Sequence, residues 1–255
     1  MVKTIIPAFP KEKRVPGESS FPLLDVAEAF TNVVQGEGPY VGTPATFLRM
    51  KNCTLSCSWC DTTEVWKKGN KYTSHEILEL FKEFGVIDKL KNWNHHLVVT
   101  GGSPLNQQKG LYFLFSLIRS SMYNVPFVEM ENEAVLKPDT NTIAYVSHWN
   151  NSPKLSNSGM RKEVRYKPEV LKIMNSLTSS IFKFVITKEE DWDEIKRDFI
   201  ETGLIDRSKI YIMPEGSTRA ELQVKYSDLI DLANREGVRL TDRFQVTAFD
   251  KTVGV

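Results

Sequence analysis

All three cysteines of this 255-residue chain lie in one short segment, Cys53-Thr54-Leu55-Ser56-Cys57-Ser58-Trp59-Cys60. Disulfides need an even number of cysteines, and isolated structural cysteines would be spread along the sequence, so this clustering predicts one loop at one metal centre. A structural zinc site usually takes four protein ligands, and no histidine follows at the spacing of a zinc finger. An iron–sulfur cube held by three thiolates keeps one iron open to a small molecule. The alternative is an incomplete zinc site or a buried thiol cluster.

The spacing CxxxCxxC, with an aromatic residue before the last cysteine, resembles the radical S-adenosylmethionine (SAM) superfamily. The resemblance implies a 4Fe–4S cluster held by Cys53, Cys57 and Cys60. It also implies that SAM binds the open iron through its amino and carboxylate groups. An electron from the cluster then splits SAM into methionine and a 5′-deoxyadenosyl radical.

The charge of the chain is balanced, with 33 Lys and Arg against 32 Asp and Glu, a net charge of +1. This balance gives no general electrostatic attraction to nucleic acid or to an acidic membrane. No apolar run approaches the ~20 residues of a spanning helix, and residues 1–20 lack the apolar core of a signal peptide. We therefore expect a cytoplasmic, reducing location, with neither nucleic acid nor membrane as a partner.

Apolar periodicity and turn signals predict alternating strands and helices. The expected strands are 24–30, 45–50, 97–100, 125–129, 142–147, 181–186, 210–213 and 244–248. The expected helices are 73–84 (with a capping box of Thr73 and Glu76), 111–122, 168–177, 189–199 and 217–236. This alternation predicts an α/β fold with a parallel sheet and right-handed crossovers, in one domain over 23–255 after an arm at 1–22. Polar motifs follow three strands, at 53–62, 101–107 and 152–159, and therefore predict one shared site at the carboxyl edge.

Further motifs resemble a narrower group, the 7-carboxy-7-deazaguanine synthase family. They occur in the family's order and comprise Gln35-Gly36-Glu37-Gly38-Pro39-Tyr40-Val41-Gly42, Pro44-Ala45, Arg49, the cysteines, Asp61-Thr62, Thr100-Gly101-Gly102-Ser103-Pro104-Leu105, Val128-Glu129-Met130-Glu131, residues 152–159, Lys183-Phe184-Val185 and Met213-Pro214-Glu215-Gly216. Gln-Gly-Glu-Gly-Pro upstream of the cysteine loop is a specific combination, whereas a lone Gly-Gly-x-Pro is not.

The resemblance implies a partial, six-strand (β/α) barrel, usually a homodimer, that acts as a lyase. Its substrate would be 6-carboxy-5,6,7,8-tetrahydropterin, whose ring contracts with loss of ammonia to give 7-carboxy-7-deazaguanine. The product serves queuosine or other deazapurines, in tRNA or in DNA. SAM would be regenerated, Mg²⁺ would assist the rearrangement, and a protein such as flavodoxin would donate the electron.

The resemblance also implies residues for the substrate. Arg49 would hold the pterin carboxylate, because a planar guanidinium pairs with a carboxylate through two bonds; an ion pair at the sheet end is the alternative. Gln35 and Glu37 would meet the guanidine-like pterin edge and take part in catalysis, although a plain turn also explains the glycines around Glu37. Asp61 would either bind the substrate or orient a neighbour.

Other positions are implied for SAM and Mg²⁺. Thr62 would offer its hydroxyl to Mg²⁺, a hard cation that prefers oxygen. Trp59 would lie against the adenine, shield the cluster, or do both. The remaining SAM contacts implied are Thr100, Gly101, Gly102, Ser103, Glu131, Ser152 and Lys154.

Two departures mark a divergent member. Ser103 stands where the family's Gly-Gly-Glu-Pro has the glutamate expected to hold the SAM amino group. Thr247 stands where the family often has a histidine, while Gln245 and the carboxylate of Val255 remain candidates to reach the pterin. A different radical SAM chemistry, or a regulatory protein that kept the fold and cluster, are the competing hypotheses.

Overall fold

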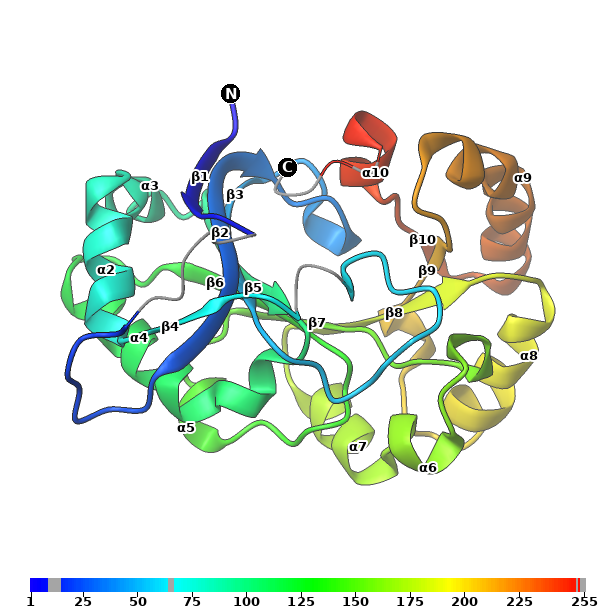
Figure 1. The fold of residues 1–255 in the computed structure, drawn as a ribbon. Coiled ribbons are helices and arrows are strands. Elements are labelled where there is room, and N and C mark those ends of the chain that lie inside the picture. Colours follow the sequence, from blue (N-terminus) through cyan, green and yellow to red (C-terminus); the bar gives the residue numbers. More distant parts are fainter. Residues whose placement is uncertain (9–14, 64–66, 251, 253–255) are drawn as a thin grey trace.

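The computed structural model describes residues 1–8, 15–63, 67–250 and 252. One sheet runs through it (Figure 1). Its strands are β1 (Lys3–Ile6), β2 (Leu24–Val34), β3 (Pro44–Met50), β4 (Asn70–Tyr72), β5 (His96–Gly101), β6 (Phe127–Asn132), β7 (His148–Asn151), β8 (Ser180–Ile186), β9 (Ile210–Pro214) and β10 (Arg239–Leu240). Their order is β1-β2-β3-β5-β6-β7-β8-β9-β10, and β4 pairs with β2.

The sheet is parallel from β3 to β10 and antiparallel around β2. Within the described ranges no pairing joins its two ends, so the sheet stays open. The predicted α/β architecture with a partial barrel is confirmed. In the segment expected to form an N-terminal arm, Lys3–Ile6 adds β1 to the edge of β2; residues 9–14 of that segment lie outside the described residues.

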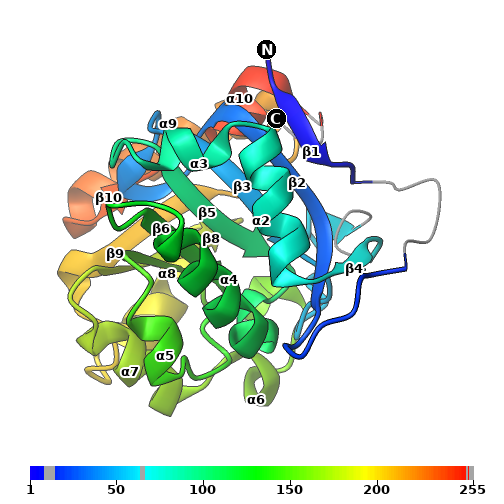
Figure 2. The ribbon, with the colours of Figure 1, turned by 90° about the vertical axis from the view of Figure 1, so that its left-hand side faces the viewer.

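Helices form an arc around the outside of the sheet (Figures 1 and 2). They are α2 (Ser74–Glu83), α3 (Val86–Leu90), α4 (Gln108–Ser120), α5 (Thr140–Ile143), α6 (Lys162–Arg165), α7 (Pro168–Ser176), α8 (Glu190–Ile195) with a π-helical turn at Lys196–Ile200, and α9 (Arg219–Glu236). One more helix, α10 (Phe244–Phe249), follows β10. The predicted capping box begins α2: Thr73 accepts from the amide of Glu76, and Glu76 accepts from the amide of Thr73. Among the residues that the structure describes, none of the helices has the length and apolar character needed to span a bilayer.

Two of the predicted strands are wrong, since residues 142–147 and 244–248 do not form strands. In the first segment Asp139 accepts a hydrogen bond from the amide of Thr142 at 2.7 Å and begins the short helix α5. Residues 144–147 then form a turn that leads into β7. The second segment alternates apolar and polar residues like a strand, but it folds as α10, which leaves Phe244 and Phe249 exposed and buries Val246. Contacts with distant parts of the chain decide its form, and a local pattern does not contain them.

The loop after β2 closes the amino end of the parallel strands. Tyr40 lies edge-on against His96, Phe127 and His148, with ring centroids 4.9, 5.2 and 4.9 Å away. These three residues begin β5, β6 and β7. The segment 35–40 therefore forms a floor at one end of the strands, and the cysteine loop follows β3 at the opposite end.

Candidate active site

A cavity of about 620 Å³ collects almost every predicted site residue. Of the predicted residues, it is lined by Gln35, Glu37, Arg49, Cys53, Cys57, Trp59, Cys60, Asp61, Thr62, Thr100, Gly101, Gly102, Glu131, Ser152, Lys154 and Gln245. The predicted convergence of the motifs that follow β3, β5 and β7 is confirmed. Ser103 lies behind this wall, fully buried. Val255 lies outside the described residues.

Two glycines let the end of β5 lie against the cysteine loop. A Cβ atom on Gly102 would come within 1.9 Å of the carbonyl oxygen of Asn52, and one on Gly101, whose φ is +131°, within 2.2 Å of that of Met50. The amide of Ser103 also donates to the Asn52 carbonyl at 2.7 Å. The Gly-Gly pair is therefore needed for this close approach of two backbones.

The three cysteines form no disulfide and are half-buried along the cavity wall. Burial raises the pKa of the Cys53 and Cys57 thiols, and Lys154 acts in the opposite direction on both. In the described ranges no three Cys, His, Asp or Glu side chains form a ready site for a single metal ion. A cube places each thiolate on a different iron, so its ligands stand farther apart than those of one ion. Three thiols on a single cavity wall, none of them in a disulfide, fit such a cluster.

A second loop supports the wall beside the cysteines. The indole Nε1 of Trp59 donates to the carbonyl of Asn157 at 3.1 Å. Lys154 lies 5.5 Å from the centroid of that indole ring and donates to the hydroxyl of Ser152 at 2.7 Å. An ammonium and a hydroxyl thus lie next to the cluster loop, as groups that bind a carboxylate would.

Arg49, on β3, lines the cavity and is held by a buried partner, Glu28, that the sequence did not predict. Its Nε donates to Oε1 of Glu28 at 2.7 Å, so the expected alternative of an ion pair is present. The pair uses only Nε, and no hydrogen bond from its two Nη groups is found among the described residues. Glu28 therefore orients the guanidinium and leaves its fork available.

The floor of the cavity is a buried network of charges. Lys183, on β8, donates to Glu37 at 2.8 Å and to Glu131 at 3.4 Å. The side-chain Nε2 of Gln35 donates to Glu129 at 2.9 Å. The side-chain Oε1 of Gln35 accepts from the backbone amides of Gly36 and Glu37. Glu131 also accepts from Thr100 at 2.7 Å. Gln35 and Glu131 are thus held by the protein itself.

Lys183 fixes the charge of this floor. Burial alone would raise the pKa of Glu37, but Lys183 and Arg243 outweigh it and lower the pKa to about 2. Burial likewise would lower the pKa of Lys183, and Glu131 and Glu37 together raise it. A single lysine inside an otherwise apolar strand is a sequence signal that could have identified Lys183 as a site residue.

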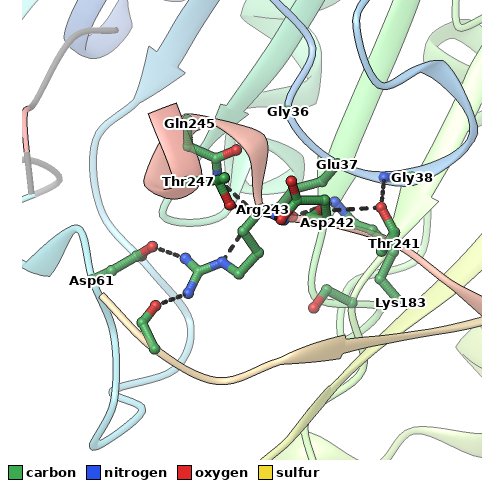
Figure 3. Close-up of polar contacts among 12 residues, drawn as sticks. Gly36, Glu37, Gly38, Asp61, Lys183, Thr241, Asp242, Arg243, Gln245 and Thr247 are labelled. Carbon is green, nitrogen blue, oxygen red and sulfur yellow. Dashed lines mark hydrogen bonds and ion pairs between the residues drawn. The ribbon is translucent and has the colours of Figure 1, made fainter. Parts of the chain in front are cut away.

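Arg243, just before α10, connects the floor to the cysteine loop (Figure 3). Its guanidinium contacts the carboxylate of Asp61, lies 3.4 Å from Glu37, and donates to the carbonyl of Gly216. Gln245 donates to Glu37 at 2.8 Å. No pattern around Arg243 in the sequence indicated this role.

Thr247 does not replace a substrate-binding histidine. Its hydroxyl donates to Oδ1 of Asp242 at 3.0 Å, and the same carboxylate oxygen accepts from the hydroxyl of Tyr226. Thr247 is absent from the cavity wall, whereas Gln245 is part of it. The hydroxyl therefore supports α10, and Gln245 is the polar group that this helix presents to the cavity.

Comparison with known proteins supports the metal centre. Residues 34–134 match the family described as a 4Fe-4S single cluster domain. A 7-carboxy-7-deazaguanine synthase of Pyrobaculum aerophilum is 30% identical over 239 residues, which cover 92% of this chain and 99% of the relative. The chain belongs to the 7-carboxy-7-deazaguanine synthase family. It is thus a radical SAM lyase with a 4Fe–4S cluster and SAM as cofactors.

Other members of the 7-carboxy-7-deazaguanine synthase family extend the match. The enzyme of Aquifex aeolicus is 30% identical over 205 residues, covering 80% of this chain and 82% of its own. The crystal structure of QueE from Escherichia coli superposes with a TM-score of 0.62 at 20% identity, covering 86% of this chain and 93% of that one. The superposition shows that the fold is shared.

Proposed function

We propose that this protein converts 6-carboxy-5,6,7,8-tetrahydropterin to 7-carboxy-7-deazaguanine with loss of ammonia. One observation carries the proposal: a single cavity is lined by three cysteines, by an oriented arginine and by a floor of fixed buried charges. When bound, the cluster and SAM supply a carbon radical that removes a hydrogen atom from the substrate. A substrate held by the arginine and the floor would present its ring to that radical.

Each group of the chain has a distinct task in this proposal. Arg49 binds the pterin carboxylate through its Nη groups, with Glu28 holding the guanidinium in place. The guanidine-like edge of the pterin lies over the floor, where Glu37 stays ionised because its pKa is about 2. Gln35 keeps Glu37 in position through its hydrogen bond from the Glu37 amide at 3.2 Å.

Asp61, Gln245 and Thr62 complete the substrate end in the proposal. Asp61 and Gln245 are both held by the Arg243–Glu37 network, and both line the cavity. Thr62 lies on the same wall, with its hydroxyl 3.7 Å from the sulfur of Cys60, and would give Mg²⁺ one oxygen ligand. Such an ion keeps several waters and takes the substrate carboxylate as a further ligand.

The test is anaerobic reconstitution with iron, sulfide and SAM, followed by incubation with the carboxylated tetrahydropterin and Mg²⁺. Mass spectrometry should detect a product of the mass of 7-carboxy-7-deazaguanine and show the release of ammonia. A protein that binds SAM and yields no such product would refute the reaction and favour the regulatory alternative.

The setting of the reaction follows from its chemistry. A cluster with one open iron is sensitive to oxidants, which supports a reducing, cytoplasmic location and a protein electron donor of the flavodoxin kind. We also propose a homodimer, as the family resemblance implies, and no nucleic acid partner, because the net charge is only +1. Size-exclusion chromatography with light scattering tests the homodimer.

Replacing Arg49 with lysine should lower kcat/KM for the pterin. The expected fall corresponds to a loss of about 2–4 kcal/mol of transition-state stabilisation. A lysine cannot pair with a carboxylate through two parallel bonds, and the substrate charge would be poorly paired in a partly dry cavity. SAM cleavage without substrate should be almost unchanged. Arg119→Lys, on the exposed side of α4, is the matched control. Equal loss of both activities in Arg49→Lys would instead show that Arg49 supports the fold.

A further inference from the structure

Glu133 is a buried residue just after β6. One of its carboxylate oxygens accepts hydrogen bonds, and the other accepts none from the described residues. Oε1 accepts hydrogen bonds from the hydroxyls of Ser103 and Thr54, at 2.8 and 2.6 Å. Oε2 is buried and receives no hydrogen bond from any residue that the structure describes. Glu133 as a whole is only 5% exposed. Two protein donors thus hold this carboxylate in one orientation with a vacant acceptor.

An unpaired oxygen on a buried carboxylate is unfavourable, because the group has lost water and gained no donor in exchange. The nearby cations do not supply that donor. Lys183 is bound to Glu37 and Glu131, and Lys154 to Ser152. In the described part of the chain no ion pair joins a lysine or arginine to Glu133. The missing donor is therefore to be sought in a ligand.

The position of Glu133 indicates which ligand. It lines the same cavity as Cys53, Cys57 and Cys60. The hydroxyl of Ser103 lies 2.8 Å from Glu133 and 3.6 Å from the sulfur of Cys53, so one hydroxyl separates the carboxylate from a cluster ligand. A group with N–H donors that binds beside the cluster would meet this carboxylate.

We propose that Glu133 binds the amino group of SAM, and that Ser103 is a positioning residue that holds the Glu133 carboxylate. The proposal rests on the proposed function for the presence of the cluster and SAM. It accounts for the serine at position 103 in physical terms: the carboxylate is supplied by the end of β6 instead of by the Gly-Gly loop. A glutamate at 103 would place a second negative charge in a fully buried position against the first.

SAM binding to the reconstituted protein tests this proposal through equilibrium dissociation constants measured by calorimetry. Glu133→Gln should keep about four irons per chain and bind SAM on the order of tenfold to a hundredfold more weakly, because an ammonium–carboxylate ion pair is replaced by a hydrogen bond to an uncharged amide. S-adenosylhomocysteine, which has the amino group and is not cleaved, should lose affinity for Glu133→Gln to a similar extent. Methylthioadenosine, which lacks the amino-acid part, should bind both proteins equally.

Three further variants sharpen the result. Ser103→Ala should lose part of the affinity, and Ser103→Glu should gain none. Glu215→Gln is the matched control, since Glu215 lines the cavity but is paired with Lys225 at 2.6 Å, and SAM binding should not change.

Unchanged SAM affinity in Glu133→Gln, or tighter binding in Ser103→Glu, would overturn the proposal for Glu133 while leaving the reaction intact. Product failure in a wild-type protein that shows the expected binding pattern would refute the reaction alone. A wild-type protein that takes up no cluster and binds no SAM would overturn both.

Discussion

Alanine at Cys53, Cys57 or Cys60 should each abolish cluster retention, SAM binding at iron and product formation. Only three thiolates line the cavity, so each substitution leaves two to hold four irons, which is too few. Iron and sulfide analysis, with the broad visible absorption of the reconstituted protein, measures the loss. Ser56→Ala, at an exposed position of the same loop, is the matched control and should retain the full cluster.

Two results would contradict this interpretation of the cysteines. One is zinc retained at stoichiometry with no iron uptake by the wild-type protein, which would return the loop to the zinc hypothesis. The other is a single alanine variant that still holds about four irons, since a cube with two protein thiolates should be lost.

Lys183→Met should lower the free energy of unfolding by about 3–5 kcal/mol, because it leaves Glu131 without its buried cation and Glu37 with Arg243 alone. The Lys183 side chain is only 3% exposed, and no water can replace it readily. Anaerobic urea denaturation followed by circular dichroism measures the change. Lys196→Met removes an exposed i,i+3 pair with Asp193 and should change the free energy of unfolding far less, because solvent screens such a pair.

The loss of unfolding free energy caused by Lys183→Met should become smaller as the pH falls. Glu37 has its pKa lowered from 4.5 to about 2 in the folded wild-type protein, so its ion pair adds stability above pH 4.5 and loses that contribution as pH falls toward 2. The difference between wild type and variant should therefore be largest near neutral pH and shrink below pH 4.5. A difference that stays constant between pH 7 and pH 3 would show that Lys183 acts through packing alone.

Most of the fold was predictable because its signals are local. The segments that became β3, β5, β8 and β9 are short apolar runs bounded by turn residues, and the cap at Thr73 has its own sequence pattern. The errors at 142–147 and 244–248 arose where a cap or distant contacts outweighed an apolar pattern. Strand β1 is short and lies at an edge, so its existence depends on β2 and not on its own residues.

The site was predictable as a set of residues but not as a set of contacts. Sequence motifs identified the walls of the cavity, yet Glu28, Lys183 and Arg243 have roles that depend on which oppositely charged side chain each one meets. Those partners lie 21, 146 and 206 residues away from them, at Arg49, Glu37 and Glu37 respectively. Pairing at that range is set by the folded topology, and spacing along the chain does not encode it.

Because the floor and α10 are far apart in the sequence, the parts of the site form at different times during synthesis. Gly38 binds Thr241 and Glu37 binds Gln245 across 203 and 208 residues, whereas the cysteine loop lies between β3 and β5 in the first half of the chain. Chains emerge from the ribosome amino end first, and contacts between remote residues are slow to form. The sulfur ligands are therefore synthesised long before the last helix completes the floor of the cavity.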